Sequence, residues 1–121
     1  IYIHRLVKAR GYDAKIINGI PSFCAVSAKL EDSLADRSEQ IHIIPSTYGV
    51  EDALNLSGTK VLMKAASKMP LVNEALKRSN TTCSMIENCG MPDEHIYHCI
   101  DEIPDQASYY SIIVVKEEPH D

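Results

Sequence analysis

The sequence predicts an α/β fold, with a mixed β-sheet of about five strands flanked by helices. Two observations predict it. Strand-like segments rich in β-branched residues alternate with helix-like segments along much of the chain, and strand-like segments dominate toward its end. The 121 residues, 45% of them hydrophobic, are enough for one compact domain with a core of its own.

The first 30 residues are predicted to form a helix, a strand and a second helix. The apolar residues of "IYIHRLVKARG" share one helical face, and the glycine that ends this stretch is typical of a helix C-terminus. Tyr12–Asn18 is predicted to be a short strand that ends in a turn at Gly19. Pro21 suits the start of a helix that runs to about Leu30, because the N–H that proline lacks would have no helical partner there.

The rest of the chain is predicted to contain four more strands, two helices and one partly extended segment. The strands are Ile41–Ser46, Thr59–Lys64, Thr81–Asn88 and Tyr109–Glu118, the helices are Tyr48–Gly58 and Met69–Asn80, and the partly extended segment is His95–Ile103. The first of these helices has an acidic start and a glycine at its end. The second has a proline near its start and basic residues near its end, which suits the helix dipole.

Composition and charge exclude several classes of function. The net charge of −5 argues against a nucleic-acid surface, because phosphate contacts need clustered Lys and Arg. No apolar run approaches the roughly 18 residues of a membrane span. The four cysteines lack the spacing of a disulfide framework, so we expect reduced thiols and a cytoplasmic protein. The chain does not begin with Met and starts as a helix already under way, so we expect it to be part of a longer protein.

A metal site and a thiol nucleophile are both weighed and ranked low. Cys83, Cys89, His95, His98 and Cys99 cluster in the sequence, but they do not form the two closely spaced ligand pairs of a structural zinc site. Adjacent residues of a strand also point to opposite faces, so His98 and Cys99 could not both bind one ion. We therefore predict no metal.

Cys24, at the start of the second predicted helix, is where a helix dipole would favour a thiolate. No local signature of a thiol enzyme surrounds it.

Three places in the sequence put small residues or glycine beside the end of a predicted strand. They are "INGIPSFCAVSAKL", "SGTKVLMKAA" and "ENCGMPDEHIYH". Ligands of α/β proteins bind where strands end and loops begin. Small side chains there would let a flat apolar ligand lie close to the backbone.

Four stretches, in this order, resemble the C-terminal half of the tetrapyrrole (corrin/porphyrin) methylases. "IINGIPSFCAVSAKL" resembles the family's PG-(I/V)-(S/T/P)-S segment and the helix after it, although Asn18 stands where the family usually has Pro. "SGTKVLMKAA" resembles a TLVLYM-like strand, and "ENCGMPDEHIYHCIDEI" resembles a G-(T/L)-(P/S)-(E/D)-(Q/E)-x-(V/I) segment. "YYSIIVVKEE" is similar to the closing P-(A/S)-(L/I)-(I/V)-(I/V)-V-G strand. Within the family, the motifs look most like the precorrin-2 C(20)-methyltransferases, including their cobalt-factor II form.

The resemblance implies a fold, an activity and a set of partners. Residues 1–121 would be the C-terminal (second) domain of an S-adenosylmethionine-dependent C-methyltransferase that acts on a precorrin-type tetrapyrrole in cobalamin biosynthesis. The N-terminal domain, with its GDP-type loop, would be absent from this chain, which would be inactive alone. The family's proteins form homodimers, so a homodimer is implied as well.

The resemblance also implies which residues contact the cofactor. In such enzymes S-adenosylmethionine lies folded in the cleft between the two domains. The matching positions are Pro21 and Ser22 at a helix start, Met63 and Lys64 at a strand end, and Cys99 near the adenine. No residue is assigned a catalytic role, because a sulfonium is already a strong electrophile and the protein has mainly to position two reactants.

Two other classes of function remain open. The chain could be a non-catalytic binding or dimerisation module, which loss of cofactor binding on Ser22→Tyr would argue against. It could also be a small thiol or metal enzyme, which stoichiometric zinc in the purified chain would favour.

Overall fold

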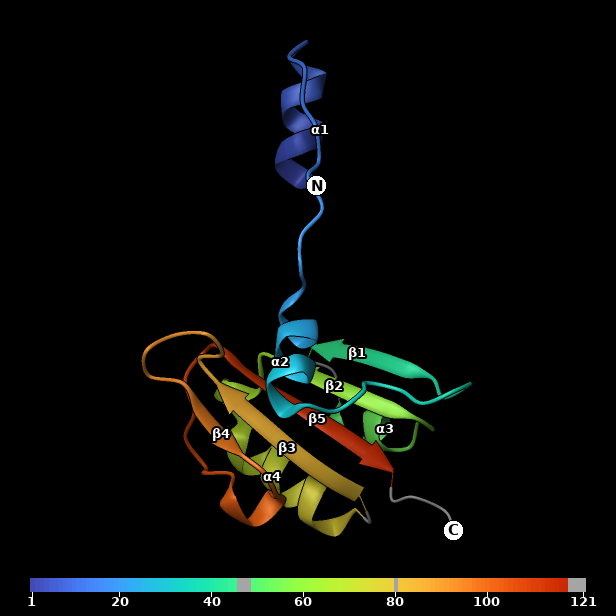
Figure 1. Ribbon diagram of the computed structural model, residues 1–121, viewed down its shortest axis with the longest axis vertical. Coiled ribbons are helices and arrows are strands. Elements are labelled where there is room, and N and C mark those ends of the chain that lie inside the picture. The colour runs from blue at the N-terminus through green and yellow to red at the C-terminus, as the bar shows by residue number, and fades with distance from the viewer. Residues whose placement is uncertain (46–48, 80, 118–121) are drawn as a thin grey trace.

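The computed structural model describes residues 1–45, 49–79 and 81–117 and contains the predicted five-stranded mixed sheet (Figure 1). The strands are β1 (Ile41–Pro45), β2 (Thr59–Met63), β3 (Thr81–Glu87), β4 (His95–Tyr97) and β5 (Ser111–Glu117). Their order in the sheet is β1-β2-β5-β3-β4. β1 and β2 run parallel, and all other neighbouring strands run antiparallel. By this order β5, the last of the described strands, lies in the middle of the sheet.

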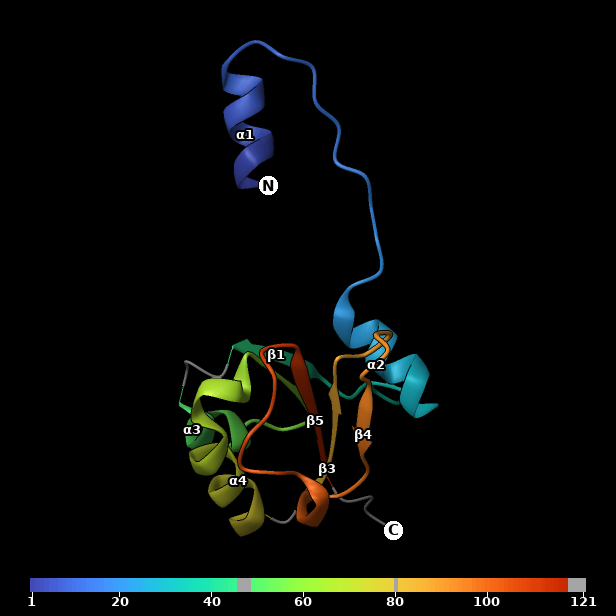
Figure 2. The ribbon, with the colours of Figure 1, turned by 90° about the vertical axis from the view of Figure 1, so that its left-hand side faces the viewer.

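Helices lie on both faces of this sheet. The helices of the described residues are α1 (Tyr2–Ala9), α2 (Ser22–Leu30), α3 (Val50–Leu54) and α4 (Met69–Arg78), with 3₁₀ turns η1 (Ala65–Lys68) and η2 (Ile100–Glu102). Figure 2 shows α3 and α4 on one face and α2 on the other, near one end of the strands. α1 stands away from the sheet and buries none of its residues. No helix within the described ranges is long and apolar enough to cross a membrane.

The core has two halves because neighbouring residues of a strand point to opposite faces. Leu62 packs with Met69 and Leu76 beneath α4. Val61, its neighbour in β2, packs on the other face with Val26 of α2 and with Ile112. α2 therefore attaches to the sheet through Val26, its one buried residue, with Phe23 and Leu30 partly buried beside it, and Ser22 at the start of the helix stays exposed.

The predicted strand Tyr12–Asn18 is wrong. Residues 12–20 form no regular element, and their large apolar side chains are exposed, by 68% for Tyr12 and by 88% for Ile17. A strand needs a neighbour to pair its backbone groups, and no strand of the described sheet pairs with this segment. Its β-branched composition therefore does not produce a strand here.

The predicted helix over residues 48–58 is shorter than expected. α3 ends at Leu54, and the chain then turns through Gly58, whose φ of +95° suits glycine. The next backbone N–H, that of Thr59, donates to the carbonyl of Gln40 at 2.9 Å and sets β2 beside β1. The ends of four predicted elements lie outside the described residues: Ser46, Tyr48, Asn80 and Glu118.

Candidate functional site

The start of α2 presents a small polar residue to the end of the sheet. Pro21 has extended backbone angles and its carbonyl accepts hydrogen bonds from Cys24 N, at 3.0 Å, and Ala25 N, at 3.3 Å. Ser22 is the first helical residue and is exposed. Its hydroxyl makes no hydrogen bond to another described residue, so it is available to a ligand.

The end of β2 lies across from this helix start. Met63 is the last residue of β2, pairs with Ile112 of β5, and packs against the core half beneath α2. Lys64 follows in the left-handed region, with φ +60° and ψ +35°, and this turn directs the chain into η1. The strand therefore ends abruptly at Met63 and leaves space beyond it.

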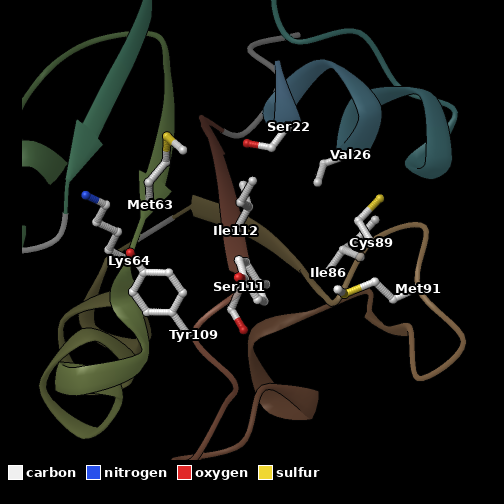
Figure 3. Close-up of a pocket in the computed structure, with 11 residues that line it drawn as sticks. Ser22, Val26, Met63, Lys64, Ile86, Cys89, Met91, Tyr109, Ser111 and Ile112 are labelled. Atoms are coloured by element: carbon white, nitrogen blue, oxygen red, sulfur yellow. The ribbon is translucent and has the colours of Figure 1, made fainter. Parts of the chain in front are cut away.

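That space is a pocket of about 290 Å³ between α2 and the ends of three strands. Figure 3 shows Ser22 and Val26 on one side of it and Met63 on the other, with Ile112 between them. Lys64 also lines the pocket, and its ammonium group points away from Ser22. The other lining residues come from β3 and the loop after it and from the chain that enters β5. They are Ile86, Cys89, Met91, Tyr109, Tyr110 and Ser111. The walls are mainly apolar with a few polar groups among them, as in a site for a small organic ligand.

An ion pair holds α2 to the loop that carries Cys89 and Met91. Lys29 Nζ lies 3.2 Å from Glu94 Oε1, and Gly90 N donates to Glu94 Oε2 at 2.7 Å. The hydrogen bond from Gly90, helped by the charge of Lys29, lowers the pKa of Glu94 below its usual range. Burial, and then the negative charge of Glu94, raises the pKa of the Cys89 thiol. The thiolate of Cys89 is therefore disfavoured, which makes Cys89 a poorer nucleophile than an ordinary thiol.

The structure brings three of the five predicted cofactor residues together. Ser22, Met63 and Lys64 all line the pocket. Pro21 precedes Ser22 and is exposed beside the pocket without lining it. Cys99 is exposed at the start of η2. It lies toward the opposite end of the sheet, because β4 pairs antiparallel with β3 and leads the chain away from the pocket.

Sequence reasoning missed the two tyrosines of the pocket wall. Tyr109 and Tyr110 were assigned to a predicted strand, but β5 begins at Ser111 and the tyrosines precede it. Their rings stand edge to face, with centroids 5.3 Å apart, and are exposed by 64% and 63%. Two adjacent exposed aromatic rings before a buried strand are the signal that could have found them.

The residues weighed as metal ligands do not assemble. Within residues 1–45, 49–79 and 81–117, no group of three or more His, Cys, Asp or Glu side chains is placed to hold a metal ion. Cys83 is buried in the core half beneath α4, and burial raises the pKa of its thiol. Cys24 is exposed on α2 and does not line the pocket.

Comparisons with known proteins find relatives of both the sequence and the fold. The sequence model of the Tetrapyrrole (Corrin/Porphyrin) Methylases matches residues 1–102. Over 118 residues, the chain is 25% identical to a probable cobalt-precorrin-2 C(20)-methyltransferase of Methanocaldococcus jannaschii. The match covers 95% of this chain and 51% of that protein, so the chain spans about half the length of this relative.

Solved structures have the same fold. A cobalt precorrin-4 methyltransferase superposes with a TM-score of 0.74 at 17% identity, over 93% of this chain and 55% of that one. The uroporphyrin-III C-methyltransferase of Thermus thermophilus, complexed with S-adenosylhomocysteine, gives a TM-score of 0.68 at 12% identity, over 93% and 57%. Since the family model covers most of the sequence, the chain belongs to the tetrapyrrole (corrin/porphyrin) methylase family.

Proposed function

We propose that this chain is the C-terminal domain of an S-adenosylmethionine-dependent C-methyltransferase that acts on a precorrin-type tetrapyrrole in cobalamin biosynthesis. The observation that carries the proposal is the convergence of the start of α2 and the end of β2 on one apolar pocket. The 25% identity to the relative named above favours precorrin-2 as substrate and its C(20) carbon as methyl acceptor.

The pocket has the properties that the nucleoside of S-adenosylmethionine requires. Val26, Met63 and Ile112 offer apolar surface to a flat adenine ring, and the Ser22 hydroxyl is a polar group without a partner among the described residues. Leaving a buried polar edge of the ligand unpaired would cost about 1–3 kcal/mol. The volume of about 290 Å³ is just below that of typical ligand pockets, which span roughly 300–1,000 Å³. We infer that this chain encloses part of the cofactor and that a preceding domain encloses the rest.

The chain's own residues would act by position rather than by proton transfer. When bound, the cofactor supplies a methyl group on a sulfonium, and an electron-rich carbon of the macrocycle can accept it without acid catalysis. Ser22 would contact the bound nucleoside from the start of α2, and Lys64 from the end of β2. Met63 and Val26 keep water from its apolar side. Holding two reactants in line can contribute up to roughly 7–11 kcal/mol to the lowering of the barrier.

The exposed N-terminal segment supports a further protein contact. Ile16, Ile17 and Ile20 are exposed by 62%, 88% and 83%, and α1 buries no residue. Apolar side chains gathered in this way mark a surface that another body covers. We propose the preceding domain of the same protein as that body, and a homodimer as the assembled form. The same segment also favours the second candidate function, a non-catalytic interaction module.

Titration of the 121-residue chain with S-adenosylhomocysteine, followed by amide NMR, tests the proposal. We expect a dissociation constant on the order of 1 mM, with shifts concentrated at Ser22, Met63 and residues 109–112. Homocysteine, which lacks the nucleoside, serves as the control ligand and should produce no such shifts. Shifts elsewhere, or none at saturating ligand, would favour the interaction module. Micromolar affinity would show that the preceding domain is not needed for binding.

A further inference from the structure

One side of the pocket is built by two loops that no strand pairing holds. Residues 88–94, between β3 and β4, carry Cys89 and Met91. Residues 104–110, before β5, carry Tyr109 and Tyr110. Because strand pairing does not fix these loops, the positions of their pocket-lining residues depend on contacts between the loops.

Asn88 makes those contacts with both loops. Its backbone N–H donates to the carbonyl of Tyr110 at 2.8 Å, and its Oδ1 accepts from Ser108 Oγ at 2.8 Å. Within its own loop, its Nδ2 donates to Asp93 Oδ2 at 3.0 Å, and its carbonyl accepts from Met91 N at 3.0 Å. Its side chain is only 8% exposed. One buried residue thus fixes the backbone next to the pocket-lining residues of each loop.

The neighbouring hydrogen bonds reinforce this connection. Ser108 N donates to Glu87 Oε1 at 2.8 Å, and Ser111 Oγ donates to the carbonyl of Ser108, also at 2.8 Å. The ion pair of Lys29 with Glu94 adds α2 to the same network. The network therefore joins the two loops, the start of β5 and α2, which all contribute residues to the pocket lining.

The position suits asparagine for two reasons. Asn88 has φ +54°, in the left-handed region that asparagine tolerates better than most residues. Its amide also both accepts from Ser108 and donates to Asp93. Glycine at this position would suit the positive φ but would make neither side-chain hydrogen bond. An aspartate would place its carboxylate beside that of Asp93.

We propose that Asn88 is a positioning residue that holds Met91 and the two tyrosines in the arrangement that receives the nucleoside of S-adenosylmethionine. This inference rests on the proposed function. Its side chain acts through the two loops and does not itself line the pocket.

The test compares three variants of the 121-residue chain. N88G keeps the backbone conformation and removes the side-chain hydrogen bonds. N88D removes the donor, and the double variant N88D/D93N restores a donor–acceptor pair with its direction reversed. R37G is the matched control, because Arg37 has the same φ of +54° on an exposed turn outside the pocket. Amide NMR measures the affinity for S-adenosylhomocysteine, and hydrogen exchange measures the protection of the loop amides.

We expect N88G and N88D to weaken binding by about tenfold, since each removes buried hydrogen bonds that support the loops. N88D/D93N should recover most of the affinity, and R37G should bind like the unsubstituted chain. The amide of Met91 and the backbone amide at position 88 should exchange about tenfold faster in N88G, while the amide of Val61 in β2 should not change.

Three results would overturn the inference, and they differ from a failure of the proposed function. Equal affinity of N88G and the unsubstituted chain would refute it. So would unchanged exchange at Met91 and Asn88, or a double variant no better than N88D. An unsubstituted chain that does not bind S-adenosylhomocysteine would refute the proposed function and, with it, this inference.

Discussion

Replacing Ser22 by tyrosine would fill the pocket from the α2 side. Ser22 is exposed at the first position of α2, and its hydroxyl makes no hydrogen bond to another described residue. Serine and tyrosine have similar helix propensities. We therefore expect Ser22→Tyr to change the free energy of unfolding by no more than about 0.5 kcal/mol, as for an ordinary surface substitution.

The effect on ligand binding should be far larger. The tyrosine ring would enter a pocket of about 290 Å³ and take the place proposed for adenine. The about ten non-hydrogen atoms of adenine, at ~0.3 kcal/mol each, correspond to about 3 kcal/mol of binding free energy, or roughly 100-fold in affinity. Saturable NMR shifts with S-adenosylhomocysteine should disappear at concentrations that saturate the unsubstituted chain.

Ala28→Tyr is the matched control for this measurement. Ala28 is exposed on the same helix and does not line the pocket, so its replacement adds a similar ring without obstruction. We expect it to bind S-adenosylhomocysteine like the unsubstituted chain. Unchanged affinity of the Ser22→Tyr variant, with its fold intact by circular dichroism, would show that the nucleoside does not bind here.

Three further predictions follow from the core, the thiols and one carboxylate. Leu62→Ala removes a fully buried side chain from β2 and should lower the free energy of unfolding in urea by about 2–5 kcal/mol; a loss below about 1 kcal/mol would contradict the packing described here. Iodoacetamide should modify Cys83 only in the unfolded chain, and S-adenosylhomocysteine should slow the modification of Cys89, which mass spectrometry can follow at each residue. The pKa of Glu94 is lower in the folded chain than in the unfolded one, so its stabilising contribution is complete above the ordinary glutamate value of about 4.3 and is lost as the pH falls through the folded value. The amide chemical shift of Gly90, which donates to Glu94, should therefore change with pH only below the ordinary glutamate pKa, and Glu94→Gln should abolish that change.

Most of the sheet and the position of the pocket could be predicted from local pattern. The segment Thr59–Lys64 carries β-branched residues after a glycine and before two alanines, and those signals need no tertiary information. The three small-residue loops also indicated where a ligand could bind, and two of them contribute Ser22 and Met63 to one pocket. The third contributes Cys89.

The failures have tertiary causes. The segment Tyr12–Asn18 has the composition of a strand, but pairing depends on a neighbour that local sequence does not reveal. Cys99 is a different case, because the antiparallel pairing of β4 with β3 carries it away from the pocket, and its contact with the adenine stays a prediction. The role of Asn88 arises from hydrogen bonds to residues about 20 positions away, which no short motif encodes.

The central place of β5 has a consequence for how the chain is made. β2 and β3 do not pair with each other, and each is joined to the sheet's middle only through β5. While the ribosome is still synthesising residues 111–117, the β1–β2 pair and the β3–β4 hairpin are separate pieces with unpaired backbone edges. Pairing over such sequence separation is slow and leaves these edges open to aggregation. Release of the last strand from the exit tunnel is therefore the event that allows the pocket to form.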